Sequence, residues 1–157
     1  TAQRFCAAIA PCASQARRAG IELLVEPAPT LYADRYFTHT LRDAVQLAEQ
    51  AEVGVVIDLF ACWTEAQLRE SIERAIPRCH LVQVADYVLG DRAFPCRAVP
   101  GDGAIPLARI IGWILEAGYR GAFDLELMGP RIDKEGHCEA VRRTTERLGE
   151  LLIRLRG

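Results

Sequence analysis

The stretch Val53-Gly54-Val55-Val56-Ile57-Asp58 decides the fold class more than any other part of the chain. It carries no polar side chain before its last position, which is acidic. Strands that are apolar on both faces are typical of parallel sheets, whereas strands with one solvated face alternate apolar and polar residues. Residues 64–76 follow with helical spacing and place Leu68, Ile72 and Ile76 four apart. The stretch therefore predicts a buried strand that leads into an amphipathic helix.

Three similar apolar runs, at residues 21–25, 81–85 and 122–127, predict three further strands. Helical spacing recurs after each of the four runs. The other predicted helices cover residues 40–48, 105–117 and 135–155, and a helix over residues 2–19 precedes the first strand and is closed by Gly20. Strands that alternate with amphipathic helices predict an α/β protein with a parallel sheet. Periodicity alone does not distinguish an open doubly wound sheet from a barrel.

Two helix starts have the pattern of a capping box, in which a Thr side chain accepts a hydrogen bond from the backbone three residues later. These are Thr40-Leu-Arg-Asp43 and Thr64-Glu-Ala-Gln67, so helices are expected to begin at both. The helix that starts at Thr64 is expected to stop at Pro77. In the last helix, the apolar spacing predicts an inward face made of Val141, Thr145, Leu148, Leu152 and Leu155.

Polar side chains stand at or near the end of every predicted strand. They are Glu26, Asp58, Gln83 with Asp86, and Glu126. Because the carboxyl ends of parallel strands share one edge, where ligands bind in barrels and doubly wound sheets, these oxygens are expected to converge. Carboxylates and an amide without thiolate or imidazole form a hard oxygen site suited to Mn²⁺ or Mg²⁺. The pattern therefore favours a barrel with a divalent cation at its mouth.

Composition restricts the classes of function. The chain has 157 residues, of which 50% are hydrophobic and 25% charged, with a formal net charge of −2. This length and composition predict one globular domain over residues 1–157. The absence of basic runs argues against nucleic acid and anionic membranes as partners, and no apolar run approaches the roughly 20 residues of a membrane span. The six scattered cysteines contain no C-x-x-C pair, and no secretory segment opens the chain, so a cytoplasmic protein with reduced thiols is expected.

An ordered set of short motifs resembles the xylose isomerase-like sugar phosphate isomerase/epimerase family of TIM barrels. The motifs are Leu-Val-Glu26-Pro, Val-Val-Ile-Asp58-Leu-Phe, Val-Gln83-Val-Ala-Asp86, Arg97-Ala-Val-Pro-Gly-Asp-Gly103 and Gly-Tyr-Arg-Gly-Ala-Phe-Asp-Leu-Glu126. Each is weak alone, but their order and intervals fit the family over nearly the whole chain. The resemblance covers only the C-terminal half of such a barrel, about four βα units plus the N-terminal helix.

The resemblance implies a set of site residues. Glu26, Asp58, Gln83 and Glu126 would bind one divalent cation, Mn²⁺ or Mg²⁺, with Co²⁺ also compatible. Glu26 and Glu126 would in addition act as the catalytic acid and base, while Arg97 and Asp86 would bind substrate. Two positions depart from the family pattern: Ala61 replaces a common His, and Ala104 replaces a Glu that often follows the Pro-Gly-x-Gly loop.

The implied activity is isomerisation or epimerisation of a small sugar or hydroxy-keto compound through an enediolate. An inosose-type dehydratase of the same family would share the first proton removal, and a non-catalytic half-barrel that binds or assembles is a third reading. The apurinic endonuclease branch is disfavoured, because its multi-zinc site needs several His ligands. The three histidines, His39, His80 and His137, do not match the strand ends.

A complete barrel needs eight strands and typically about 250 residues. Four βα units alone would leave two open sheet edges and a bare inner face. Three arrangements would resolve this: a longer protein that supplies the N-terminal half-barrel, association with a second copy or another half-barrel, or an open sheet.

Overall fold

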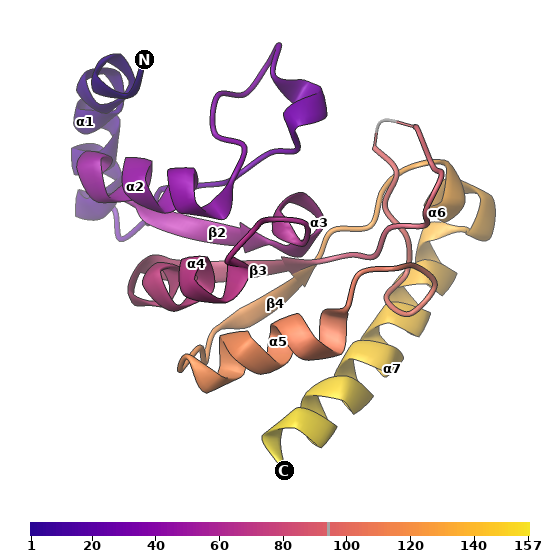
Figure 1. The fold of residues 1–157 in the computed structure, drawn as a ribbon. Helices are drawn as coiled ribbons and strands as arrows, with labels where there is room; N and C mark the ends of the chain where they lie inside the picture. The colour runs from indigo at the N-terminus through magenta and orange to yellow at the C-terminus, as the bar shows by residue number, and fades with distance from the viewer. Residues whose placement is uncertain (94) are drawn as a thin grey trace.

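The computed structural model describes residues 1–93 and 95–157, and it contains one four-stranded parallel sheet (Figure 1). Its strands are β1 (Leu24–Val25), β2 (Gly54–Asp58), β3 (Cys79–Val84) and β4 (Ala122–Leu125). They lie side by side in chain order and every neighbouring pair is parallel. Helices connect them, so the predicted parallel α/β fold of half-barrel type is confirmed.

Five longer helices accompany the sheet: α1 (Ala2–Arg18), α2 (Leu41–Ala51), α4 (Leu68–Ala75), α5 (Leu107–Glu116) and α7 (His137–Arg156). Shorter ones are α3 (Leu59–Cys62), α6 (Pro130–Glu135) and the 3-10 turns η1 (Thr30–Tyr32) and η2 (Ile76–Arg78). In Figure 1, α2, α4 and α5 follow one another in the same order as the strands. Among the residues that the structure describes, no helix combines the length and apolar character that crossing a bilayer requires.

The two faces of the sheet differ in what covers them. One face carries Val25, Val55, Ile57, Val82 and Val84, which are buried in the main core together with residues of the helices. Successive strand residues point to opposite faces, and paired residues of neighbouring strands share a face. The other face is partly open, because Ala122 and Asp124 on β4 are exposed there. This second face is the one that would line the inside of a closed barrel.

The N-terminus of α2 is capped by two side chains, and only one of them was predicted. Thr40 Oγ1 accepts a hydrogen bond from the Asp43 N–H at 3.0 Å, as the capping pattern indicated. The predicted start at Thr64 is wrong, because α4 begins only at Leu68, after Gln67 in the left-handed conformation (φ 59°). Residues 64–67 form a turn instead. This turn lets Glu65 reach α2, where Oε2 accepts from Leu41 N–H at 2.7 Å and Oε1 from Arg42 N–H at 3.2 Å.

We expect Glu65→Ala to lower the free energy of unfolding by about 1–3 kcal/mol, because it leaves the buried Leu41 N–H without its acceptor. Urea unfolding followed by far-UV circular dichroism measures the change. Glu22→Ala, at an exposed position outside the helices and strands, is the control and should stay within about 0.5 kcal/mol of wild type. Equal stability of the two variants would show that Glu65 does not stabilise α2.

The C-terminal helix differs from the prediction in extent and in its buried face. The expected single helix over residues 135–155 is interrupted at Gly136, whose φ of 97° separates α6 from α7. The fully buried side of α7 consists of Ala140, Thr144 and Leu148, while Val141 is 46% exposed. The expected inward positions of Val141 and Thr145 are therefore wrong, because the apolar stripe begins one residue earlier.

Strand ends also shift from their predicted positions. The first strand was expected over residues 21–25, but only Leu24 and Val25 pair with β2, and Ile21 is 57% exposed at this sheet edge. The third strand begins at Cys79, two residues earlier than expected, and the fourth ends at Leu125 instead of residue 127. Pro77 lies in η2, directly after α4 has ended at Ala75, as expected.

Candidate metal and proton-transfer site

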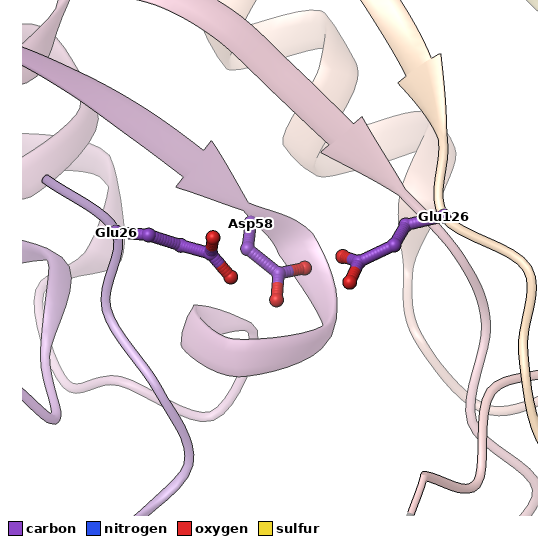
Figure 2. A group of neighbouring side chains, drawn as sticks. All are labelled: Glu26, Asp58 and Glu126. Carbon is purple, nitrogen blue, oxygen red and sulfur yellow. The ribbon is translucent and has the colours of Figure 1, made fainter. Parts of the chain in front are cut away.

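Three of the predicted carboxylates converge at the carboxyl ends of the strands. Glu26 directly follows β1, Asp58 is the last residue of β2, and Glu126 directly follows β4. One oxygen of each lies within 4.8 Å of the others. Figure 2 shows Glu26 and Glu126 reaching toward Asp58 from opposite sides. The convergence follows from the parallel sheet, which brings these strand ends to one edge.

Asp58 and Arg97 form the centre of the cluster. Arg97 Nη1 lies 3.1 Å from Asp58 Oδ1, and Arg97 Nη2 lies 3.0 Å from Asp58 Oδ2, which is a two-bond ion pair. Arg97 Nη2 also lies 2.6 Å from Glu126 Oε2, an ion-pair contact without hydrogen-bond alignment. The guanidinium packs against the Phe60 ring, 4.6 Å from its centroid. Arg97 is 7% and Asp58 1% exposed, so the guanidinium offsets part of the negative charge of the cluster from a buried position.

Burial and mutual repulsion alter the acidity of the two glutamates. Burial raises the pKa of Glu126 to about 7; Arg97 opposes this shift, and the charges of Asp58 and Glu26 add to it. The pKa of Glu26 is also raised, first by burial among protein atoms, although part of its surface is exposed, and second by Asp58. A carboxyl with a pKa near neutrality can both hold and release a proton under ordinary conditions. Glu126 has this property before any ligand is considered.

Gln83 is the fourth predicted metal ligand. It is the register partner of Asp58 on the neighbouring strand, so the two side chains leave the same face of the sheet. Its Oε1 atom is buried and has no hydrogen-bond partner among the described residues. Buried acceptors are nearly always paired, so an orphaned one beside an acidic cluster suits a cation ligand. Three carboxylates and this amide oxygen therefore fit a hard divalent cation such as Mn²⁺ or Mg²⁺.

Asp86 stands apart from the cluster and holds a loop. Its Oδ1 accepts from the N–H groups of Tyr87 (2.8 Å) and Ile105 (3.0 Å), and its Oδ2 from those of Gly101 (2.8 Å) and Gly103 (3.0 Å). A Cβ atom at Gly103 would overlap with Asp86 Oδ1 and with the Tyr87 carbonyl, so only glycine fits this close approach. With both oxygens engaged, Asp86 is a positioning residue, and direct contact with substrate stays a prediction.

The loop held by Asp86 also delivers Arg97. The backbones of Asp86 and Ala98 exchange two hydrogen bonds of 2.8 Å, and the Arg97 N–H donates to the Met128 carbonyl at 3.2 Å. These contacts fix Arg97 between the carboxyl ends of β3 and β4. Arg97 was predicted to contact substrate, and the structure places it within the acidic cluster, where it also balances charge.

The aromatic residues near the acidic cluster were not predicted from the sequence. A pocket of about 220 Å³ is lined by Glu26, Asp58, Arg97 and Glu126 together with Tyr32 and Phe60. Phe60 stands two residues after Asp58 in a motif already recognised, so its proximity could have been inferred. Tyr32 lies in η1, which has no periodic signal, and its position depends on the fold of the β1–α2 connection.

The fold and the site define half of a parallel β/α barrel with an acidic cluster at the carboxyl ends of its strands. The family model described as xylose isomerase-like TIM barrel matches residues 1–148, and the chain belongs to this family. No curated protein matches the chain.

Solved structures match over nearly the whole chain but with about half of their own length. Protein SMc04130 from Sinorhizobium meliloti 1021 is 29% identical, with a TM-score of 0.78, over 93% of this chain and 56% of its own. The IOLI protein with a binding zinc atom is 19% identical, with a TM-score of 0.81, over 98% and 57%. D-psicose 3-epimerase with D-tagatose, from Clostridium cellulolyticum H10, is 18% identical, with a TM-score of 0.75, over 98% and 56%.

Proposed function

We propose that the chain provides the metal and proton-transfer half of a divalent-metal-dependent isomerase or epimerase of a small sugar or hydroxy-keto compound. The observation that carries this proposal is the convergence of Glu26, Asp58 and Glu126, with the pKa of Glu126 raised to about 7. Membership of the family supports it, as does the structural match to a protein named as a sugar epimerase.

The two glutamates lie on opposite sides of Asp58 (Figure 2), so each can address one face of a substrate held between them. One glutamate would remove a proton from the carbon next to a carbonyl, which gives an enediolate, and a glutamate would return a proton at another carbon or on the other face. Return at the former carbonyl carbon, with the proton of the neighbouring hydroxyl moving to the former carbonyl oxygen, is isomerisation, and return to the same carbon on the opposite face is epimerisation. The near-neutral pKa of Glu126 suits both directions of transfer.

We propose that Glu26, Asp58, Gln83 and Glu126 hold one divalent cation, Mn²⁺ or Mg²⁺, with Co²⁺ also compatible. When bound, the cation would supply a Lewis acid that polarises a substrate carbonyl. Because Arg97 now contacts Asp58 and Glu126, it would give up part of these contacts and become available to a substrate hydroxyl or carboxylate. The matched IOLI structure is described with a zinc atom, which supports a divalent ion in this fold without fixing its identity.

We also propose that a further half-barrel, from the same protein or from a second copy, covers the open face of the sheet. The site residues lie on that face, and Ala122 and Asp124 beside them are exposed. The chain spans little more than half the length of the structures it matches. The six cysteines are all free, which supports a reducing compartment, and we propose the cytoplasm.

Thermal melting with each cation and with EDTA tests the metal site. A ligand that binds only the folded state stabilises it by about 2.7 kcal/mol at a concentration of about 100 times its Kd. For a domain of this size we expect the melting temperature to rise by about 5–11 °C with the preferred cation. Asp124→Asn, which removes an exposed carboxylate from β4, should keep this rise. A normally folded protein that shows no rise with Mn²⁺, Mg²⁺ or Co²⁺ would refute the site.

A further inference from the structure

A second, larger pocket adjoins the acidic cluster and is not used by the chemistry proposed above. Its volume is about 580 Å³, and it lies between η1, α3 and the loop that follows β3. It shares Pro29, Tyr32 and Phe60 with the pocket that contains the acidic cluster. A ligand that extends past these shared residues from one pocket into the other would have one end at Glu126 and Asp58 and the other end in the larger pocket.

Four aromatic rings line this larger pocket: Tyr32, Phe60, Trp63 and Tyr87. Phe60 and Tyr87 pack edge to face with centroids 5.9 Å apart, and Trp63 and Tyr87 lie 6.3 Å apart. The rings of Phe60, Trp63 and Tyr87 are thus held by one another and only half-buried, so part of each remains available. Aromatic walls offer stacking surfaces to a planar or aromatic ligand group.

Arg92 is the cationic side chain in the pocket wall, which also contains the carboxylates of Asp91 and Glu65. Asp91 is paired with Arg131 outside the pocket (Nη2–Oδ1 3.0 Å), and Glu65 is occupied by the N–H groups at the start of α2 and by Ser71 Oγ at 2.9 Å. Arg92 instead donates only to neutral oxygens, the Tyr87 hydroxyl and the Asp91 carbonyl, both at 3.0 Å. No carboxylate among the described residues forms an ion pair with Arg92. Its charge is therefore free to attract an anionic ligand group.

One residue of the pocket wall has a small side chain. Ala61 lies on α3 between Phe60 and the core residue Cys62, and it lines the larger pocket. A larger residue at this position would project into the space between the aromatic walls. A larger side chain at position 61 is therefore a way to fill the pocket.

We propose that this pocket binds an aromatic carboxylate group, so that the ligand of the site combines a hydroxy-keto end at the acidic cluster with an aryl carboxylate end beside Arg92. This rests on the proposed function for the first end only. The second end is recognised by the ring walls and by the unpaired guanidinium, neither of which needs a metal or an active enzyme.

Calorimetric titration of the protein in EDTA with 3-phenylpropionate tests the proposal. Two matched probes separate its parts: 3-phenylpropan-1-ol keeps the ring without the charge, and hexanoate keeps the charge without the ring. We expect 3-phenylpropionate to bind at least about 5-fold more tightly than either. Equal or tighter binding of the alcohol or of hexanoate would overturn the proposal, as would no binding of any probe.

Variants assign the binding to this pocket. Ala61→Phe should abolish binding of 3-phenylpropionate, and Ala66→Phe, which adds the same side chain at an exposed turn outside the pocket, should not. Arg92→Gln should remove the preference for the acid over the alcohol. Unchanged binding by Ala61→Phe, with a circular dichroism spectrum and melting temperature like wild type, would overturn the assignment. Glu126→Gln should bind the probe as wild type does, so failure of the proposed catalysis and failure of this pocket are distinguishable.

Discussion

Asp58→Asn is expected to destabilise the metal-free protein by about 3 kcal/mol and to abolish its response to divalent cations. The Asn side chain keeps the oxygen that accepts the Phe60 N–H at the start of α3. The measured loss of stability therefore reports the removal of the negative charge of Asp58 and not the loss of this helix cap. Breaking a buried ion pair by removing one partner costs about 3–5 kcal/mol, because the other charge stays buried. Arg97 retains its contact with Glu126, which places the expected loss at the lower end of that range.

For Arg97→Met, which removes the other half of the ion pair, we expect the opposite response to the divalent cation. Without the guanidinium, the carboxylates of Glu26, Asp58 and Glu126 face one another within 4.8 Å, and their repulsion should also lower the melting temperature in EDTA. A divalent cation would replace the lost charge and restore stability. Asp58→Asn and Arg97→Met should therefore melt early in EDTA, but only Arg97→Met should recover with Mn²⁺.

An exposed pair of the same chemistry is the control. Arg74 binds Glu49 through Nε at 3.1 Å and Nη2 at 2.5 Å, but both side chains are open to solvent. Arg74→Met should change the melting temperature little, since exposed ion pairs contribute little to stability. If Asp58→Asn kept the wild-type rise with Mn²⁺, Asp58 would not be a ligand. If Arg97→Met melted like wild type in EDTA, the charge of Arg97 would not stabilise the cluster.

The strand-end acids could be predicted because they depend on local pattern and one rule of topology. A run such as Val53 to Ile57 fixes a buried parallel strand, and the acid that ends it must then share an edge with the acids that end its neighbours. Glu26 and Glu126 were found in the same way. Predicting that the three carboxylates converge therefore requires no knowledge of the loops.

Residues positioned by long-range contacts could not be predicted in this way. Glu65 was assigned to its own helix, yet it caps α2, because a turn with Gln67 at positive φ displaced the start of α4. Arg97 was predicted to bind substrate, and its place beside Asp58 was not predicted, because it depends on backbone hydrogen bonds of Ala98 with Asp86 and of Arg97 with Met128. Such contacts leave no periodic trace in the sequence.

Arg97 and a divalent cation would each compensate the negative charge of the same acidic cluster. Clustered carboxylates repel one another, so a positive charge nearby stabilises them, and the Arg97 guanidinium supplies one through its contacts with Asp58 and Glu126. We propose that Arg97 offsets part of the negative charge of the cluster until the cation binds. The same arginine then faces the space where substrate would lie.

Glu126→Gln is expected to reduce proton exchange from one face of the substrate by about 10²–10⁴-fold, the range typical of a positioned general base. The measurement is deuterium incorporation from D₂O by the Mn²⁺-loaded protein, with D-psicose and its 3-epimer as probes. Because Glu26 and Glu126 reach Asp58 from opposite sides (Figure 2), each should exchange the proton of one epimer. Glu126→Gln should therefore lose exchange in one sugar and keep it in the other.

Glu26→Gln should show the reverse selectivity, and both variants should lose epimerisation, which needs both glutamates. Asp124→Asn, at an exposed position on β4 two residues before Glu126, is the control and should keep both exchanges. Survival of both exchanges in Glu126→Gln would show that Glu126 is not the base. Loss of the same exchange in both glutamate variants, in protein whose melting temperature still rises with Mn²⁺, would instead place both residues on one proton-transfer path.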